Sequence, residues 1–423
     1  MNKKILVISY TALMASSPNG RTMQSLLQGF SSSDLALFCC YGLPDRDSCA
    51  SCYKVSNKDV VKAIYKPKCA GRIVDMDSLG DATTEIQNDQ RKGGKIAWKY
   101  LVKELIWSIG AWNNKKLKNW LEEQKPECVV YMYGNNAGLQ NLAVYVAKKF
   151  NIPLIVYTCE DYCLKDYNYI DRKKGSLWFW LFHKLTGNAT KRLFKHTDSL
   201  IANSDRLGLE YQKKYNIKNV TTVMMASQME FIRNSKVQDI ENIEVCYLGA
   251  LGHYRIKALT EIGDALQRID ARLKLHVYGR ITDELKEKLI SCQGVEYHGF
   301  VSYEEVQRVM RTSTLLIETI TDDPYINKNK KYGFSTKYAD CFACGTPLLV
   351  YAPEEIIETE FALEHNCAFV ATKNEDLESV LRIALFDEDA RNKQLDNAKR
   401  ITDIYFNNEK NCQTVADLLG IKS

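Results

Sequence analysis

The chain is poor in histidine and proline, and it has no long run of apolar residues. Only six of its 423 residues are histidine and eight are proline. No stretch approaches the roughly 18 to 20 apolar residues of a membrane-spanning helix. The first apolar run, Ile5–Ile8, is too short for the core of a signal peptide. We therefore expect a cytoplasmic protein, at most peripheral on the inner face of the cell membrane.

The chain also lacks a strong charge of either sign. It has 57 Lys and Arg against 52 Asp and Glu, a net charge of +5, with no concentrated basic stripe. Nucleic-acid binding is therefore not expected. Fourteen cysteines without a secretion signal indicate reduced thiols. Cys49 and Cys52 have the spacing of metal ligands, but two further ligands are missing, so we expect no metal.

What the chain does have is a regular alternation of short apolar runs with amphipathic segments. Helices are predicted over residues 22–30 and 138–150, the first after a loop carrying Pro18, Asn19 and Gly20. This alternation is typical of a parallel sheet covered on both faces. The strands predicted in the first half are Ile5–Ser9, Leu35–Cys39, Cys128–Met132, Leu154–Thr158 and Ser199–Ala202.

The alternation begins again after a polar stretch, residues 233–242, which is a candidate linker. Strands are predicted at Val245–Leu248, Leu273–Tyr278, Val295–His298, Leu315–Thr319, Leu348–Tyr351 and Ala368–Ala371, and helices at residues 258–269, 282–292, 303–311 and 336–344. A chain of this length exceeds one ordinary core. We expect two doubly wound α/β domains, residues 1–232 and 243–388. A helical segment, residues 389–423, could cross back to the first.

One segment, residues 332–347, carries the strongest chemical signal. Ser335 suits a helix N-cap and Gly345 the position after a helix end. A helix N-terminus attracts phosphate, and Lys337 in the first turn adds a positive charge. Asp340 shares a face with Thr336, one turn away. Phosphates at the helix end and ribose hydroxyls on the carboxylate would suit a nucleotide; the alternative is a well-capped helix with a solvated lysine.

Glycines at strand ends strengthen the nucleotide interpretation. Gly249, Gly279 and Gly299 each follow a predicted strand, where the missing side chain lets a ligand come close. Arg255 follows Gly249 in the predicted loop before the next helix. It could clamp a diphosphate bidentately. The alternative for Arg255 is a surface residue of a basic loop.

These features resemble the C-terminal half of the retaining glycosyltransferase family 4 and its GT-B relatives. The resemblance rests on Gly249 with Arg255, the Gly279 turn, and the runs His298–Val301 and Phe334–Pro347. It implies a GT-B fold, with two Rossmann-like domains facing across a cleft and a nucleotide-sugar donor bound mainly by the second.

The resemblance also implies roles for single residues. Arg255 and Lys337 would hold the donor diphosphate, Asp340 the ribose, and the backbone around Val301 the base. The chain departs from the family at Tyr332, which replaces its first acidic residue, and at Ala250, which replaces an arginine. These changes are similar to the Ser-Thr-Lys subtype of bacterial surface-polysaccharide transferases.

In the first half, two segments are candidates for the remaining roles. Gly20 stands where such enzymes place a glycine loop beside the diphosphate and acceptor; the alternative is an ordinary turn. Glu160 and Asp161 follow a strand, so either could orient the acceptor hydroxyl, with helix capping as the alternative. Adjacent residues point in different directions, so they do not form a paired acid and base.

The resemblance implies transfer of a sugar from a nucleoside diphosphate to a hydroxyl of a glycan or lipid-linked acceptor, with retention, in capsule or O-antigen synthesis. Arg255, Lys337 and the amides of residues 335–337 would stabilise the departing diphosphate. No DxD-type motif is evident, so we expect transfer without metal or cofactor. Alternatives are a nucleotide-sugar epimerase on the same fold, which would need more histidines and acids in the cleft, and a non-catalytic glycan-binding scaffold, suggested by Tyr332.

Two segments mix aromatic and basic residues. Residues 178–195 begin Trp-Phe-Trp-Leu-Phe and continue with several lysines and an arginine, a pattern that suits an anionic membrane or a lipid-linked acceptor. Residues 95–120 contain four tryptophans among many lysines, for which a buried helix with lysines facing water is the preferred interpretation.

Overall fold

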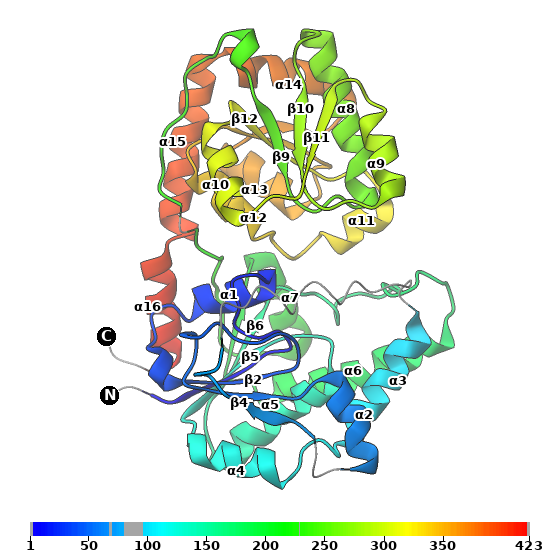
Figure 1. Ribbon diagram of the computed structural model, residues 1–423, viewed down its shortest axis with the longest axis vertical. Coiled ribbons are helices and arrows are strands. Elements are labelled where there is room, and N and C mark those ends of the chain that lie inside the picture. Colours follow the sequence, from blue (N-terminus) through cyan, green and yellow to red (C-terminus); the bar gives the residue numbers. More distant parts are fainter. Residues whose placement is uncertain (1–2, 67–69, 80–95, 228, 421–423) are drawn as a thin grey trace. The chain divides into compact units, whose positions relative to one another are not determined.

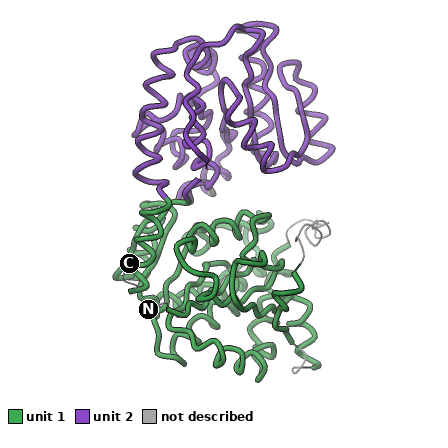
Figure 2. The backbone as a smooth tube through the Cα atoms, turned by 60° about the vertical axis from the view of Figure 1, so that its left-hand side comes forward, with its two compact units in different colours: residues 1–225, 408–423 green, residues 226–407 purple. Residues whose placement is uncertain are grey.

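The computed structural model describes residues 3–66, 70–79, 96–227 and 229–420, and the chain forms two compact units (Figure 2). The first comprises residues 1–225 and 408–423, the second residues 226–407. The polar stretch 233–242 belongs to the second unit. There the buried guanidinium of Arg391 donates to the carbonyl oxygens of Asn234 and Ser235, at 3.2 and 2.8 Å.

The first unit is built on a sheet whose described strands run in the order β4-β3-β2-β1-β5-β6-β7-β8 (Figure 1). Neighbouring strands are parallel except β3 and β4. The predicted strands are confirmed, β1 ending one residue early; β3, β4 and β8 were not predicted. The strands are β1 (Ile5–Ile8), β2 (Leu35–Cys39), β3 (Ser51–Lys54), β4 (Arg72–Val74), β5 (Cys128–Met132), β6 (Leu154–Thr158), β7 (Ser199–Ala202) and β8 (Val220–Thr222).

Helices cover both faces of this sheet (Figure 1). On one face α1 and α16 contribute Met23, Leu26 and Val415 to the core of buried strand residues. The helices are α1 (Pro18–Leu26), α2 (Asn57–Tyr65), α3 (Ala97–Ile109), α4 (Lys115–Gln124), α5 (Ala137–Phe150), α6 (Leu177–Lys195), α7 (Asp205–Tyr215) and α16 (Asn408–Leu418). In the part of the chain described, no helix is both long and apolar enough to cross a bilayer.

The second unit has a wholly parallel sheet in the order β11-β10-β9-β12-β13-β14. Its strands are β9 (Val245–Leu248), β10 (Leu275–Tyr278), β11 (Val295–Gly299), β12 (Leu315–Thr319), β13 (Leu348–Tyr351) and β14 (Phe369–Ala371). Its helices are α8 (His253–Ile269), α9 (Asp283–Ile290), α10 (Tyr303–Thr312), α11 (Pro324–Asn329), α12 (Lys337–Ala343), α13 (Ile357–His365), α14 (Asn374–Phe386) and α15 (Glu388–Tyr405). The predicted α/β class with doubly wound parallel sheets is confirmed.

Strand order shows where each unit can bind a ligand. Counted from its own first strand, the second sheet runs 3-2-1-4-5-6, so the direction of winding reverses between β9 and β12. In the first sheet the reversal lies between β1 and β5. Ligands of doubly wound sheets bind outside the carboxyl ends of the strands at this point. The residues after these four strands are therefore the first place to look for a site.

Both predicted ends of the first helix were wrong. The loop with Pro18 and Gly20 is the first turn of α1, because Pro18 occupies the first helical position, where its ring is already suited to helical geometry. That helix ends at Leu26 rather than Phe30. The C-terminal segment consists of two helices, α15 and α16.

Candidate functional site

A cluster of charged side chains lies at the reversal point of the second sheet. Gly249 directly follows β9, and Glu318 is the fourth residue of the neighbouring strand β12. Arg255 lies in the first turn of α8, and Lys337 is the first residue of α12. We call Arg255, Glu318 and Lys337 the cation site.

Lys337 and Glu318 form a close ion pair. The Lys337 Nζ lies 2.5 and 2.7 Å from the two carboxylate oxygens of Glu318. The Glu318 side chain is 5% exposed and that of Lys337 is 29% exposed. Burial lowers the pKa of Lys337 and the charge of Arg255 acts in the same direction, while Glu318 opposes both. The side chain of Lys337 is thus partly exposed, and Glu318 partly neutralises its charge.

Arg255 is buried, with 6% of its surface exposed, and it belongs to α8. The prediction that it lies in a loop was wrong, because the helix begins at His253, directly after Gly252. Its guanidinium donates to the carbonyl oxygens of Thr319 and Ala250, at 3.2 and 2.9 Å. These bonds fix the cation at the carboxyl ends of β9 and β12.

The cation site carries more positive than negative charge. Arg255 and Lys337 face one carboxylate, Glu318, and both cations lie near the ring of Tyr247, at 5.9 and 5.1 Å. A side chain at Gly249 would place its Cβ 2.9 Å from the Lys337 Nζ, so the absence of a side chain leaves room for the ammonium beside the end of β9. An excess cation in a poorly solvated position favours binding of an anion.

The start of α12 differs from the prediction. Ser335 is not its N-cap: the helix begins at Lys337 after Thr336, whose side chain makes no capping bond. The Ser335 amide instead donates to the buried carboxylate of Glu358 at 2.8 Å. Because this amide already has an acidic partner, it does not suit the predicted role as a phosphate donor. The turn at Gly345 is as predicted, with a φ of +81°.

The other predicted nucleotide contacts lie along the same sheet edge. Asp340 accepts hydrogen bonds from Ser227 and Tyr303, at 2.6 and 3.3 Å. Gly279 packs so closely against the preceding strand end that a Cβ would lie 1.9 Å from the Gly249 oxygen. Val301 is half-buried beyond β11, next to Phe300, which is 64% exposed.

The first unit holds a cavity of about 260 Å³ at its own reversal point. It lies at the carboxyl ends of β1, β5 and β6, and residues of α3 and α6 complete it. Aromatic rings dominate its lining: Tyr10, Tyr100, Tyr131, Tyr133, Tyr162 and Tyr169. We call it the tyrosine cavity.

Two carboxylates reach the tyrosine cavity. Glu160, a predicted site residue, lines it, whereas Asp161 is buried and pairs with Lys165 at 2.8 Å. The second carboxylate is Glu104 of α3, which is buried and accepts a hydrogen bond from the Ala137 amide at 2.9 Å. Burial raises the pKa of Glu104 from 4.5 to about 7. A carboxyl group with a perturbed pKa in a cavity is a candidate functional group.

Gly20 has a packing reason to be glycine. A Cβ there would lie 2.3 Å from the Met14 oxygen and 2.8 Å from the Ala12 oxygen. The segment before α1 therefore approaches the helix too closely for any side chain. Asn19, rather than Gly20, lines the tyrosine cavity.

Sequence reasoning missed Glu318 and Glu104. Glu318 stands within the apolar strand Leu-Leu-Ile-Glu-Thr, where an acid has no place unless it has a partner, and that mismatch was the available signal. Glu104 gave a weaker signal, because an acid on a helix is usually solvated.

Residues 242–383 match the family described as glycosyl transferases group 1. This range spans the whole sheet of the second unit together with the cation site. The chain is a glycosyltransferase. No curated protein is similar to it in sequence.

Solved structures of glycosyltransferases share the fold along the entire chain. A sucrose-phosphate synthase from Thermosynechococcus elongatus is 11% identical, with a TM-score of 0.64 and 98% of each chain covered. HepE from Anabaena, in complex with UDP and glucose, is 10% identical, with a TM-score of 0.61 and 99% of each covered. A trehalose 6-phosphate synthase from Burkholderia multivorans is 10% identical, with a TM-score of 0.57, covering 99% of this glycosyltransferase and 96% of its own chain. The glycosyltransferase therefore has the GT-B fold.

Proposed function

We propose that this enzyme transfers a sugar from a nucleoside diphosphate to a hydroxyl group of a glycan or a lipid-linked acceptor. The single observation that carries the proposal is the cation site, which puts Arg255 and Lys337 at the reversal point of the domain that matches group 1 glycosyl transferases. HepE, which has a similar fold, has been solved with UDP. We propose a UDP-sugar as the first donor to test.

The cation site would act on the leaving group. Breaking the bond between sugar and phosphate leaves negative charge on the diphosphate. Lys337 would approach those oxygens with its ammonium, and Arg255 would add a fixed charge beneath. Cations already held in place stabilise developing charge without reorganising during the reaction. We propose that they suffice without a metal at the diphosphate and that the sugar is transferred with retention.

The same sheet edge would hold the nucleoside. Asp340 lies one turn along α12 from Lys337, and its carboxylate already accepts two hydroxyl hydrogen bonds, so ribose hydroxyls are suitable replacements. The backbone at Val301 would meet the base. The exposed ring of Phe300, with the Arg280 guanidinium 4.1 Å from its centre, could stack on it.

The tyrosine cavity would receive the acceptor. Tyrosine combines a flat apolar face with a hydroxyl group, which suits a sugar ring that has both apolar and hydroxyl surfaces. Glu160 and Glu104 supply hydrogen-bond acceptors for the sugar hydroxyls. This pattern is typical of a carbohydrate site, and it supports a glycan acceptor. We propose that the reaction belongs to surface-polysaccharide synthesis.

A surface of the first unit would contact the membrane. The apolar side chains Trp98, Val102, Leu105 and Ile109 form a stripe along α3 at helical spacing and are 43–63% exposed. The preference for a buried helix there was therefore wrong for this face, although Trp107, Trp112 and Trp120 are buried. Lys95 lies outside the described residues.

Helix α6 adds to this surface. Leu177, Trp178 and Trp180 are 52–60% exposed, and Lys184 lies 4.8 Å from the Trp180 ring. Helices α3 and α6 pack together, so the two apolar sets lie on neighbouring helices. Exposed aromatic residues with lysines suit the interface of an anionic bilayer. We propose a peripheral cytoplasmic enzyme with a lipid-linked acceptor.

Donor binding tests the proposal directly. We expect the wild type to bind UDP, and Lys337→Ala to weaken binding about 10- to 100-fold, as for loss of charge-assisted hydrogen bonds. Lys257→Ala is the matched control, because Lys257 is an exposed lysine of α8, 69% exposed, and should bind normally. A double variant, Lys337→Met with Glu318→Gln, removes the pair without leaving a buried charge and guards against misfolding.

Turnover separates the enzyme from a scaffold. UDP and GDP sugars are supplied with lipid-linked acceptors, and nucleotide release is followed. Transfer supports the proposal. Nucleotide binding without transfer to any acceptor would favour a glycan-binding scaffold, and no binding of any nucleotide would overturn the donor site.

Vesicle binding tests the membrane surface. We expect co-sedimentation with phosphatidylglycerol vesicles and little with phosphatidylcholine, and loss of binding in Trp178→Ser with Trp180→Ser. Leu209→Ser is the control, because Leu209 is 62% exposed on α7. Equal binding by the tryptophan variant and the wild type would contradict this surface.

A further inference from the structure

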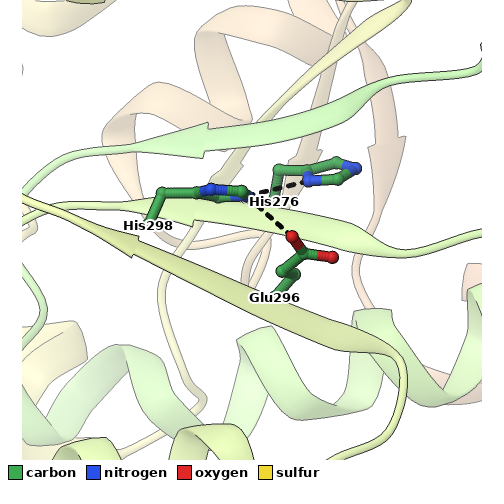
Figure 3. A group of neighbouring side chains, drawn as sticks. All are labelled: His276, Glu296 and His298. Atoms are coloured by element: carbon green, nitrogen blue, oxygen red, sulfur yellow. Dashed lines mark hydrogen bonds and ion pairs between the residues drawn. The ribbon is translucent and has the colours of Figure 1, made fainter.

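The side chains of His276, Glu296 and His298 form a cluster on the sheet of the second unit (Figure 3). His276 lies on β10 and the other two on β11, the edge strand. Their ligand atoms all lie within 4.8 Å of one another, and no other group of three His, Cys, Asp or Glu among the described residues meets this spacing. The cluster shares no residue with the cation site or the tyrosine cavity.

The strand register brings the three residues together. His276 pairs with Glu296 across the two strands, and alternate residues Glu296 and His298 share one face. A bulge after Val277 then lets Tyr278 pair with Gly299, so that His298 is the extra residue on β11. As a result the His276 Nδ1 and the His298 Nε2 lie 2.9 Å apart.

Aromatic packing holds the imidazoles in place. The His298 ring stacks on Tyr278 at 4.7 Å between centres and on His276 at 5.2 Å. The Glu296 carboxylate reaches toward the same nitrogen of His298, at 3.7 Å, as Figure 3 shows. Ligands whose rings are already oriented lose little freedom on binding an ion.

We propose that His276, Glu296 and His298 bind a divalent transition-metal ion, for which Zn²⁺ is the best fit. Two imidazoles and a carboxylate, with a position left for water or another ligand, are the ligands of an open zinc site. Two Zn–N bonds of about 2.0 to 2.1 Å spanning the 2.9 Å between the nitrogens meet at about 90°. If the two nitrogens moved apart by a few tenths of an ångström, the angle between the two Zn–N bonds would reach the tetrahedral value.

The surroundings are compatible with a cation. The charge of Glu244 also acts on His276, and it favours a positive ion there. The charge of Lys274 acts on His276 in the opposite direction to that of Glu244. The Lys274 Nζ also lies 3.7 Å from the second carboxylate oxygen of Glu296, and a bound ion would compete with it for this carboxylate. Such an ion would fasten the edge strand β11 to β10. The ion would take no part in binding the sugar donor, and its binding does not depend on the proposed transfer reaction.

Cobalt and zinc titrations of the full-length, metal-free protein test the site. We expect one equivalent of Co²⁺ to give visible absorption bands without the near-ultraviolet charge-transfer band of a thiolate ligand, and Zn²⁺ to displace it. Removing one ligand in His298→Ala or Glu296→Gln should weaken Zn²⁺ binding at least about 100-fold, more than loss of an outer partner does. His196→Ala, a histidine of the first unit, should bind as the wild type.

Three results would contradict the metal site. Equal zinc affinity in the wild type and in folded His298→Ala would overturn the site, as would a cobalt spectrum with the thiolate band alone, which would assign binding to cysteines. Melting curves guard against misfolding: zinc should raise the melting temperature of the wild type and of His196→Ala, but not that of His276→Ala. A zinc shift retained in His276→Ala would also contradict the proposal.

Discussion

Glu318 and Lys337 differ in their exposure to water, and this difference bears on how the cation site works. The carboxylate is almost fully buried at the end of β12, while the lysine keeps 29% of its side-chain surface. An incoming diphosphate would therefore meet Lys337 and compete with Glu318 for the ammonium. The carboxylate would hold the lysine in place when no nucleotide is bound, and it would weaken nucleotide binding by its charge.

Glu318→Gln separates these two effects. With one negative charge removed and both cations kept, we expect UDP to bind roughly ten-fold tighter. The free energy of unfolding without nucleotide should fall by roughly 2 to 3 kcal/mol, below the cost for a fully buried pair because Lys337 is partly exposed. Calorimetric titration with UDP measures the affinity, and unfolding by denaturant measures the free energy of unfolding. Glu284→Gln, at an exposed position of α9, is the control. Weaker UDP binding in the folded variant would show that Glu318 mainly orients Lys337.

Glu104 makes stability depend on pH. Burial raises its pKa from 4.5 to about 7, so between these values the folded chain keeps a proton that the unfolded chain has lost. Its contribution to stability is therefore complete below about pH 4.5 and is lost as pH rises through 7, by about 3 kcal/mol in all. Glu104→Gln keeps the acceptor for the Ala137 amide and should be more stable than the wild type at pH 8. Unfolding midpoints from pH 5 to 8 that fall in parallel for both would contradict this.

At the level of elements, strands with apolar runs were predictable, and the two short edge strands of the first sheet, β4 and β8, were not. Most strands of both sheets match their predicted residues, because continuous runs such as Leu348–Tyr351 are buried on both sides. The missed strand β4, Arg72–Val74, is three residues long with two of them exposed, and β8 is wholly half-exposed. Such strands exist through pairing with a neighbour, which periodicity does not reveal.

The candidate site was predictable to a similar degree. Lys337 was predicted because it follows a helix-capping residue in the first turn of a helix, and Arg255 because it follows a glycine at a strand end. The loop assignment of Arg255 failed because α8 begins without a side-chain cap, after Gly252. Glu318 and Glu104 act through partners distant in sequence, Lys337 and the Ala137 amide, so only the fold brings them into a site.

Close approach of the strand ends in the second unit leads to an element-level prediction. Gly279→Ala would push a methyl group against the Gly249 oxygen, which lies 1.9 Å from the Cβ position. We expect a loss of roughly 2 to 4 kcal/mol in unfolding free energy and weaker UDP binding, because the end of β9 must move. Gly187→Ala in α6 is the control, since its Cβ would meet nothing within 4 Å. Unchanged stability and UDP affinity in Gly279→Ala would refute the close packing.

At the scale of the whole molecule, each unit is assembled from its own sheet, but the first is completed by the end of the chain. Val415 and Leu419 join the core formed by Ile5, Val7 and their neighbours. Asn411 donates to the Met224 carbonyl oxygen at 2.6 Å, and Lys3 donates to that of Leu419 at 2.6 Å. The fold of the first unit therefore depends on residues that follow the second unit in the sequence.

A chain ending at Asn407 would separate the stability of the first unit from UDP binding by the second. It removes α16, and with it the burial of Val415 and Leu419, so unfolding of the first unit should cost roughly 3 to 5 kcal/mol less. The cation site is built wholly from the second unit, so UDP affinity should stay within about two-fold. Tryptophan fluorescence reports the first unit, because all six tryptophans lie in residues 98–180. A chain lacking only residues 421–423 is the control. The cation site contains no residue of α16. Loss of UDP binding by the shortened chain, with its second unit still folded, would therefore show that the cation site is not sufficient for donor binding.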